Sequence, residues 1–137
     1  MSFVRKLERQ PLAQDLERYI KQNPSENIKY FPTEKAMLEA FIAKLGIIDP
    51  DMIIAHNLCG GLFEVLLARV RQNQVQHWSR IGRFKRQQMP RVGNTGFAGS
   101  QWVPRQVSCG RLLVDTFLTA KELVRETKYD LGHLCKA

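Results

Sequence analysis

The chain has 137 residues, 44% of them apolar, and a formal net charge of +8 at pH 7. This length and apolar content are typical of one domain with a single buried core. No window approaches the roughly 18 consecutive apolar residues of a membrane-spanning helix, and charge begins too early for a secretory signal. We therefore predict one soluble intracellular domain over residues 1–137, which excludes the membrane-embedded and secreted classes.

The positive charge is concentrated in the middle of the chain. No acidic residue lies between Glu64 and Asp115, whereas the rest of the chain carries 12 basic and 13 acidic side chains. A block of one sign in an otherwise balanced domain favours an anionic partner, with nucleic acid the leading candidate. The basic side chains of this block are Arg69, Arg71, Arg80, Arg83, Lys85, Arg86, Arg91, Arg105 and Arg111.

The cysteines leave two interpretations open. Cys59, Cys109 and Cys135 are odd in number and widely spaced, which argues against a disulfide framework and for reduced thiols. His56 and His133 lie close to two of them in sequence, which would suit zinc. Neither spacing belongs to a common zinc pattern, so buried or incidental thiols are the favoured interpretation and no metal site is predicted.

The first third of the chain predicts helix, strand and helix. Apolar residues fall at helical intervals over 12–22, and Asn23-Pro24-Ser25 stops the pattern. Residues 27–31 form a short β-prone run. Thr33 is a plausible N-cap for a helix whose apolar face spans 36–45 and which we expect Gly46 to end.

The middle of the chain predicts a further strand and helix. The continuously apolar run 52–55 is typical of a strand buried on both faces, as in a parallel sheet. A turn at Gly60 and Gly61 leads to an amphipathic helix over 63–70. Together these elements predict an α/β fold.

The remainder contains a basic insert followed by strand and helix. Periodicity is lost over about 72–110, which predicts turns, an irregular loop or a hairpin. Residues 110–115 are strand-like, and Thr119 can cap a helix that runs through Leu123 and Val124. Residues 130–137 resemble the opening of another helix.

Three stretches of the sequence resemble one family. Residues 49–60 with 64–69 resemble the second exonuclease motif of family B DNA polymerases. Residues 77–86, followed by Met89 and Pro90, resemble a stretch particular to the alpha catalytic subunits of that family, and 109–115 with 120–125 resemble the strand and helix that follow it there. The resemblance covers most of residues 33–135.

The resemblance implies a ribonuclease H-like fold of the 3′–5′ exonuclease type, present only in part. In the family, the strand that carries the first motif and its neighbour precede this region, so we expect both to be missing. An exposed strand edge then remains, which predicts a homodimer or domain swap of the chain.

The family's exonuclease motifs supply carboxylates that hold two metal ions, and each motif can be checked here. The first is Asp-x-Glu on a core strand, and its only letter match, Asp15 to Glu17, lies in the predicted polar helix. At the second, Leu62 stands where the family has Asp, a position that alpha subunits often retain. The third lies beyond the chain's end, and Asp115 alone cannot hold two magnesium ions. We therefore predict no catalytic residue, and a vestigial motif formed by His56, Asn57, Gly60, Gly61 and Leu62.

The polar and aromatic candidates have structural alternatives. His56 and Asn57 are expected to tie a strand to its turn rather than act as a base, and the glycines after them lack any phosphate-loop pattern. For the basic insert, base stacking with phosphate pairing, aromatic anchoring to the core, and docking against another protein remain open. The predicted nucleic-acid contacts are Trp78, Arg80, Arg83, Phe84, Lys85, Arg86 and Arg91.

By resemblance, the parent protein is a nuclear, magnesium-dependent DNA polymerase that extends RNA primers in complex with primase and accessory subunits. This region would be an inactive scaffold that makes nucleic-acid contacts and needs no cofactor of its own. Two alternatives are an active ribonuclease H-like exonuclease, which would digest single strands with magnesium, and an independent basic nucleic-acid-binding module, whose affinity would fall steeply with salt.

Overall fold

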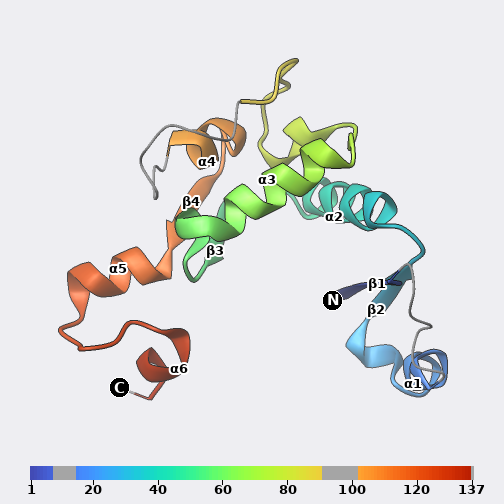
Figure 1. Cartoon of the computed structure of the whole chain (residues 1–137), viewed down its shortest axis with the longest axis horizontal. Helices are drawn as coiled ribbons and strands as arrows, with labels where there is room; N and C mark the ends of the chain where they lie inside the picture. Colours follow the sequence, from blue (N-terminus) through green and yellow to red (C-terminus); the bar gives the residue numbers. More distant parts are fainter. Residues whose placement is uncertain (8–14, 91–101, 137) are drawn as a thin grey trace.

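The computed structural model describes residues 1–7, 15–90 and 102–136. It shows short strands interleaved with helices, which confirms the predicted α/β class (Figure 1). The elements in chain order are β1 (Ser2–Arg5), α1 (Leu16–Gln22), the 3-10 turn η1 (Pro24–Glu26), β2 (Ile28–Phe31), α2 (Glu34–Ile48), β3 (Met52–Ala55), the π-helical turn η2 (Leu58–Leu62), α3 (Phe63–Gln72), the 3-10 turn η3 (Trp78–Ile81), α4 (Trp102–Val107), β4 (Leu112–Asp115), α5 (Thr116–Leu123) and α6 (Leu131–Leu134).

The described strands form two separate parallel pairs. β1 pairs with β2, with Ser2 opposite Ile28, and β3 pairs with β4, with Met52 opposite Leu112 and Ala55 opposite Asp115. Parallel strands need a long crossover connection. The crossover between β3 and β4 includes η2, α3, η3 and α4, so the whole basic block of the sequence lies between two neighbouring strands.

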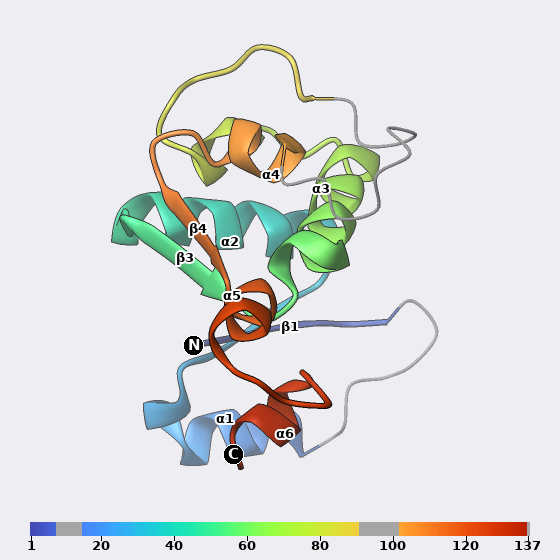
Figure 2. The same ribbon diagram turned by 90° about the vertical axis from the view of Figure 1, so that its left-hand side faces the viewer.

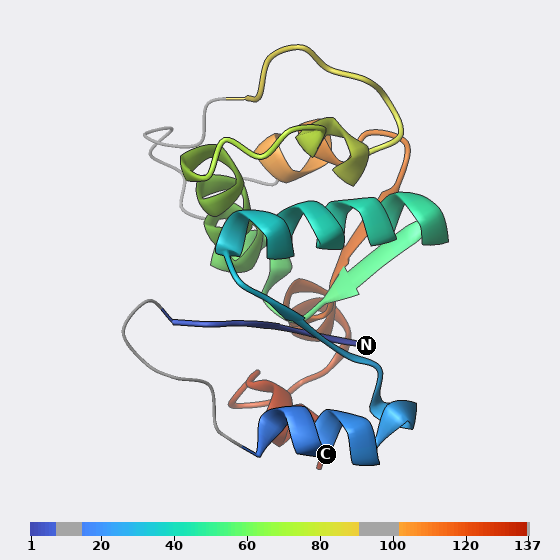
Figure 3. The ribbon, with the colours of Figure 1, turned by 90° about the vertical axis from the view of Figure 1, so that its right-hand side faces the viewer.

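The core lies between α2, α3 and one face of the β3–β4 sheet. Figure 2 shows α2 behind this sheet with α3 at one side, and Figure 3 shows α2 from its other flank. Ile53 and Leu113 face the core from the two strands, and no part of the Leu67 and Val70 side chains of α3 is exposed. The buried apolar cluster consists of Leu38, Ile42, Leu58, Phe63, Leu67, Val70, Val75, Ile81 and Val107.

Two predicted helix boundaries are wrong. Gly46 does not end α2, because Asp49 does: its backbone is left-handed (φ 46°), and its N–H donates to the Leu45 carbonyl at 3.0 Å. Thr119 does not begin the last long helix. Asp115 caps α5 by accepting from the Phe117 N–H at 3.0 Å, and the Thr119 hydroxyl donates to the Asp115 carbonyl. The predicted Thr33 cap is confirmed, with Oγ1 accepting from the Ala36 N–H.

The prediction that residues 52–55 are buried on both faces is also wrong. Met52 and Ile54 are 46% and 57% exposed, and Leu112 on β4 is 56% exposed. These side chains share the outer face of the sheet, which no described element covers. A two-stranded sheet packed on one side alternates exposed and less exposed residues, and β3 alternates exposed and partly buried ones.

Three elements were not predicted: β1, η1 and α4. The described part of the predicted basic insert, residues 72–90 and 102–110, contains the short helices η3 and α4. The predicted helix over 12–22 is described from Leu16 onward, and the predicted opening of a helix after residue 130 is confirmed as α6. No helix among the described residues is long and apolar enough to cross a bilayer.

Candidate nucleic-acid interface

The turn after β3 holds the residues of the predicted vestigial motif. The His56 ring lies against Phe117 in a T-shaped arrangement, and its Nδ1 is 3.2 Å from the Thr116 hydroxyl. Asn57 adopts a left-handed backbone (φ 56°), which turns the chain sharply out of the strand. His56 therefore contacts the start of α5, and Asn57 turns the chain out of β3.

The local backbone geometry explains why glycine occupies positions 60 and 61 of this motif. A Cβ at Gly60 would lie 1.9 Å from the Asn57 side-chain oxygen, and Gly61 has a φ of 157°, which L side chains rarely adopt. Leu62 follows, at the end of the π-helical turn, and its side chain is 57% exposed. The resemblance of the motif implies a metal-binding carboxylate at this position, where this chain has an exposed apolar side chain.

Asp115 is the buried carboxylate of this region, and both of its oxygens already accept hydrogen bonds from backbone N–H groups. Its Oδ2 accepts from the Cys59 N–H at 2.8 Å and its Oδ1 from the Phe117 N–H at 3.0 Å. Within the described ranges, no group of three or more histidine, cysteine or acidic side chains is placed to hold a metal ion. A two-magnesium site needs several converging carboxylates, and the described residues around Asp115 do not form such a set.

The two imidazoles that lie near cysteines in sequence have other partners. His56 contacts Thr116, and His133 Nε2 lies 3.1 Å from Glu126 Oε2. Cys59 is buried, and burial, together with the Asp115 carboxylate, raises the pKa of its thiol. Such a thiol is a poor nucleophile and a poor metal ligand near neutral pH.

Residues 77–87, called the basic segment below, have a backbone that is packed closely onto the domain. Trp78 packs against the core and Ile81 is 1% exposed. A Cβ at Gly82 would lie 2.5 Å from the Val107 carbonyl oxygen, so the two backbones touch. The Arg83 N–H then donates to the Cys109 carbonyl at 2.8 Å.

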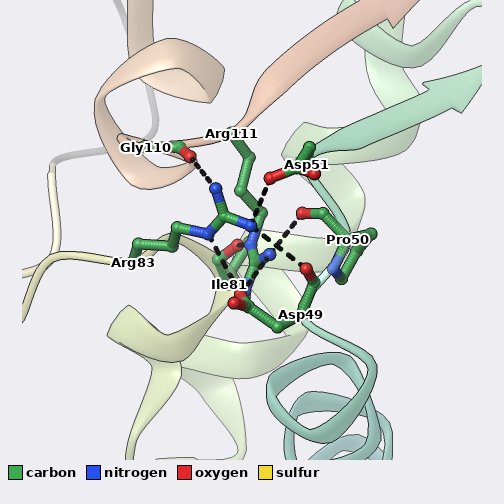
Figure 4. A network of polar contacts seen from close by, with 7 residues as sticks. All are labelled: Asp49, Pro50, Asp51, Ile81, Arg83, Gly110 and Arg111. Atoms are coloured by element: carbon green, nitrogen blue, oxygen red, sulfur yellow. Dashed lines mark hydrogen bonds and ion pairs between the residues drawn. The ribbon is translucent and has the colours of Figure 1, made fainter.

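Arg83 and Arg111 form a network with the loop that joins α2 to β3 (Figure 4). Arg83 Nε and Nη2 donate to Asp49 Oδ1 at 3.0 Å and to Asp51 Oδ1 at 2.6 Å. Arg111, whose side chain is 2% exposed, donates to Asp49 Oδ1 at 2.8 Å and to the carbonyls of Ile81 and Pro50. The hydrogen bond from Arg83 lowers the pKa of Asp49; desolvation opposes this and the bond from Arg111 adds to it.

A second ion-pair cluster uses Arg69 from the same basic block. Its Nε donates to Glu34 Oε1 at 2.6 Å, and its Nη2 bonds the other oxygen. Arg5 from β1 adds a contact to Glu34 Oε2 at 2.9 Å. Arg69, Arg83 and Arg111 of the block therefore neutralise carboxylates within the domain.

The structure divides the predicted nucleic-acid contacts into two groups. Arg83 is paired with aspartates and Trp78 faces the core. Arg80 and Lys85 are exposed, and the Phe84 ring is 63% exposed. Arg86 is half-buried, with Nη2 3.8 Å from the Cys109 sulfur, and Arg91 lies outside the described residues.

Sequence reasoning missed the residues that anchor the basic segment. Asp49 and Asp51 precede a strand, and their separation of more than 30 residues from Arg83 hides the pairing. Arg111 appeared only as one more cation of the basic block. The available signal was the charge pattern, because a block of cations can pair with carboxylates elsewhere in the chain, such as those of Asp49 and Asp51.

Comparison with known proteins places the chain in a family. The model of the exonuclease domain of DNA polymerase family B matches residues 5–134. The chain is 55% identical to the DNA polymerase alpha catalytic subunit of Oxytricha trifallax and 51% identical to that of Sterkiella nova, in both cases over 98% of its length. It is 39% identical over 74% of its length to the mouse protein of the same name.

The matched region is a small part of these relatives. It covers 9% of the Oxytricha and Sterkiella proteins and 7% of the mouse protein. The exonuclease domain of family B implies a ribonuclease H-like α/β fold, with which the α/β structure is compatible. The chain therefore belongs to the family B DNA polymerases and corresponds to part of their exonuclease domain, in agreement with the resemblance of its motifs.

Proposed function

We propose that this chain is a noncatalytic exonuclease-like domain that acts as a scaffold in a replicative DNA polymerase of the alpha type. The observation that carries the proposal is Leu62. It stands at the motif position where hydrolysis needs a carboxylate, next to a buried Asp115 that already accepts two backbone N–H groups.

The chemistry of phosphodiester hydrolysis supports this proposal. Two divalent ions activate the attacking water and stabilise the leaving oxygen, and several carboxylates must converge to hold them. Asp15 and Glu17, the letter match to the first motif, lie at the start of α1. Figure 1 draws α1 well apart from β4, the strand that Asp115 ends. These acids do not meet in space.

A digestion assay tests the absence of nuclease activity. Labelled single-stranded DNA is incubated with the chain in magnesium and, separately, in manganese, and we expect no shortening of the strand. Leu62→Asp serves as a matched variant, and we expect it to stay inactive because one added carboxylate does not complete a two-metal site. Digestion that scales with protein concentration and disappears in Asp115→Asn would overturn the proposal.

We also propose that the basic segment contacts nucleic acid. Arg80, Lys85 and Phe84 support this, because they expose two cations and an aromatic ring on one short stretch. Titration of a labelled oligonucleotide at increasing salt tests it, with affinity expected to fall steeply as counterion release weakens. Failure to bind at about 50 mM salt, where such contacts are strongest, would rule out the contact.

The role of the whole protein is proposed from the relatives' name. We infer a nuclear polymerase that uses magnesium and extends RNA primers on a DNA template together with primase and accessory subunits. Its complete chain, purified from nuclear extract, is expected to carry primer-dependent DNA synthesis and to co-purify with primase activity. Absence of synthesis from a primed template would contradict this inference.

Self-association of the isolated chain is a further proposal. The outer face of the β3–β4 sheet exposes Met52, Ile54 and Leu112, and both described sheets have only two strands. Open edges and apolar faces favour pairing with a second copy. Size-exclusion chromatography with light scattering is expected to show a dimer at high concentration, and a monomer at every concentration would contradict it.

A further inference from the structure

We propose that a pocket on the basic segment binds the phosphodiester backbone of single-stranded nucleic acid. The pocket has a volume of about 500 Å³, within the usual range for ligand sites. Its lining consists of His77, Ser79, Arg80, Lys85, Arg86 and Gln87. This inference rests on the proposed nucleic-acid contact and assigns it to particular side chains.

The charge of this pocket distinguishes it from its neighbours. Three cationic side chains line it and no carboxylate does. The adjoining cavities, which also include Arg80, contain Asp49 in one case and Glu39 in the other. An anion therefore meets uncompensated positive charge in this pocket, whereas Arg83 and Arg111 on the other flank of the segment are already neutralised by aspartates.

The backbone that carries these cations is held in place before any ligand binds. Ile81 is buried, Gly82 touches the Val107 carbonyl, and the Arg83 N–H bonds the Cys109 carbonyl. Arg111 adds a bond to the Ile81 carbonyl. Less conformational entropy is lost on binding when the groups are preorganised, so the arginine–aspartate network supports the pocket without touching the ligand.

The surrounding side chains favour a single-stranded nucleic acid over an acidic protein. Phe84 immediately precedes Lys85 and exposes 63% of its surface, which offers a face on which an unpaired base can stack. Ser79 and Gln87 supply neutral hydrogen-bond donors beside the cations, as is common in phosphate and sugar contacts. A glutamate-rich peptide would satisfy the cations but leave the exposed ring without a partner.

Anisotropy of a labelled oligo-dT, measured with the 137-residue chain at several salt concentrations, tests this inference. In the pocket variant Arg80→Ala/Lys85→Ala, we expect Kd to rise about tenfold and the salt slope to fall by about 1.4, since each single-strand phosphate contact contributes about 0.7. The matched control Lys29→Ala/Lys128→Ala removes the same charge from exposed sites elsewhere. Its Kd is expected to change less than about twofold.

The outcomes separate this inference from the proposed nucleic-acid contact. If both double variants weaken binding equally, the pocket is not the site, although contact through general charge remains. If the wild-type chain does not bind at about 50 mM salt, both proposals fall. If polyglutamate of equal charge displaces the oligonucleotide as well as unlabelled oligo-dT does, the pocket accepts acidic protein instead.

Thermal melts of all variants should match wild type, because the four replaced side chains are exposed. Should a double variant melt at a lower temperature than wild type, the single variant Lys85→Gln carries the same test.

Discussion

Arg83 donates two hydrogen bonds to Asp49, one to its side-chain carboxylate and one to its backbone carbonyl. Arg83 Nε donates to Asp49 Oδ1 at 3.0 Å, and Arg83 Nη2 donates to the Asp49 carbonyl at 3.1 Å. Asp49 is also the residue whose left-handed backbone ends α2. One residue therefore ends the longest described helix and holds the basic segment against it, so the position of the cations depends on where α2 stops.

Arg111→Met is expected to destabilise the domain. The buried guanidinium supports the Asp49 carboxylate and the carbonyls of Ile81 and Pro50, which methionine leaves without a donor. Loss of a buried charge with several partners should lower the free energy of unfolding by about 2–4 kcal/mol, measured in urea. Arg80→Met is the control, since that side chain is exposed, and we expect a change within about 0.5 kcal/mol. Equal stability of the two variants would show that the network does not hold the fold.

Two glycines give opposite expectations for the same change. At Gly82 a Cβ would lie 2.5 Å from the Val107 carbonyl oxygen and 2.9 Å from that of Cys109, both backbone atoms that cannot yield easily. Gly82→Ala should therefore cost about 1–3 kcal/mol of stability. Gly46 lies inside α2 with nothing within 4 Å of an added Cβ, so Gly46→Ala should stabilise by about 0.5–1 kcal/mol. Urea unfolding of both variants checks the pair, and a loss at Gly46 as large as at Gly82 would refute the close-approach argument.

Local patterns predicted most of the helices and strands because their signals are local. The Thr33 cap, the apolar face of α2 and the run Met52–Ala55 each act within a few residues. The errors arose where contacts between residues far apart in the sequence determine the local structure. The exposed outer face of β3 depends on what packs against the sheet, and the start of α5 depends on Asp115, whose carboxylate also accepts from Cys59. The strand β1 forms only through pairing with β2, which no periodicity in its four residues indicates.

The candidate site was predicted in composition but not in arrangement. The sequence shows that Arg80, Arg83, Lys85 and Arg86 are cations on one stretch. It does not show that Arg83 faces two aspartates while Arg80 and Lys85 line a pocket without carboxylates. That division depends on the crossover that carries the segment past the end of α2, which is a tertiary relationship.

The Glu34 cluster is expected to make stability depend on pH in the acid range. The hydrogen bond from Arg69 lowers the pKa of Glu34 below its ordinary value of 4.5; burial opposes this shift, and Asn73 and Arg5 add to it. Because the folded-state pKa lies below the unfolded one, the stabilisation is fully present above about pH 4.5 and is lost as pH falls through the folded value.

Unfolding curves between pH 3 and pH 6 check this dependence. Wild type should lose stability more steeply than Glu34→Gln as pH falls below about 4.5, because glutamine has no proton to bind. Glu17→Gln is a suitable control, since Glu17 is exposed and has the same chemistry. Parallel curves for wild type and Glu34→Gln would mean that the carboxylate of Glu34 does not contribute through its charge.

Phe84→Ala is expected to weaken the binding of single strands more than that of duplexes. One edge of the ring lies near Gly110, where an added Cβ would come within 3.3 Å of it, and 63% of the residue remains exposed. Stacking on an unpaired base contributes about 1–3 kcal/mol, so Kd for oligo-dT should rise about tenfold. Bases in a duplex are already stacked on one another, so its Kd should change less than about twofold, whereas Phe84→Tyr keeps the ring and should bind both as wild type does. Anisotropy titrations with the two ligands measure the difference. Equal losses on single strand and duplex would mean that Phe84 acts by holding the segment on Gly110 and not by stacking, because a disturbed backbone would displace the cations from either ligand alike.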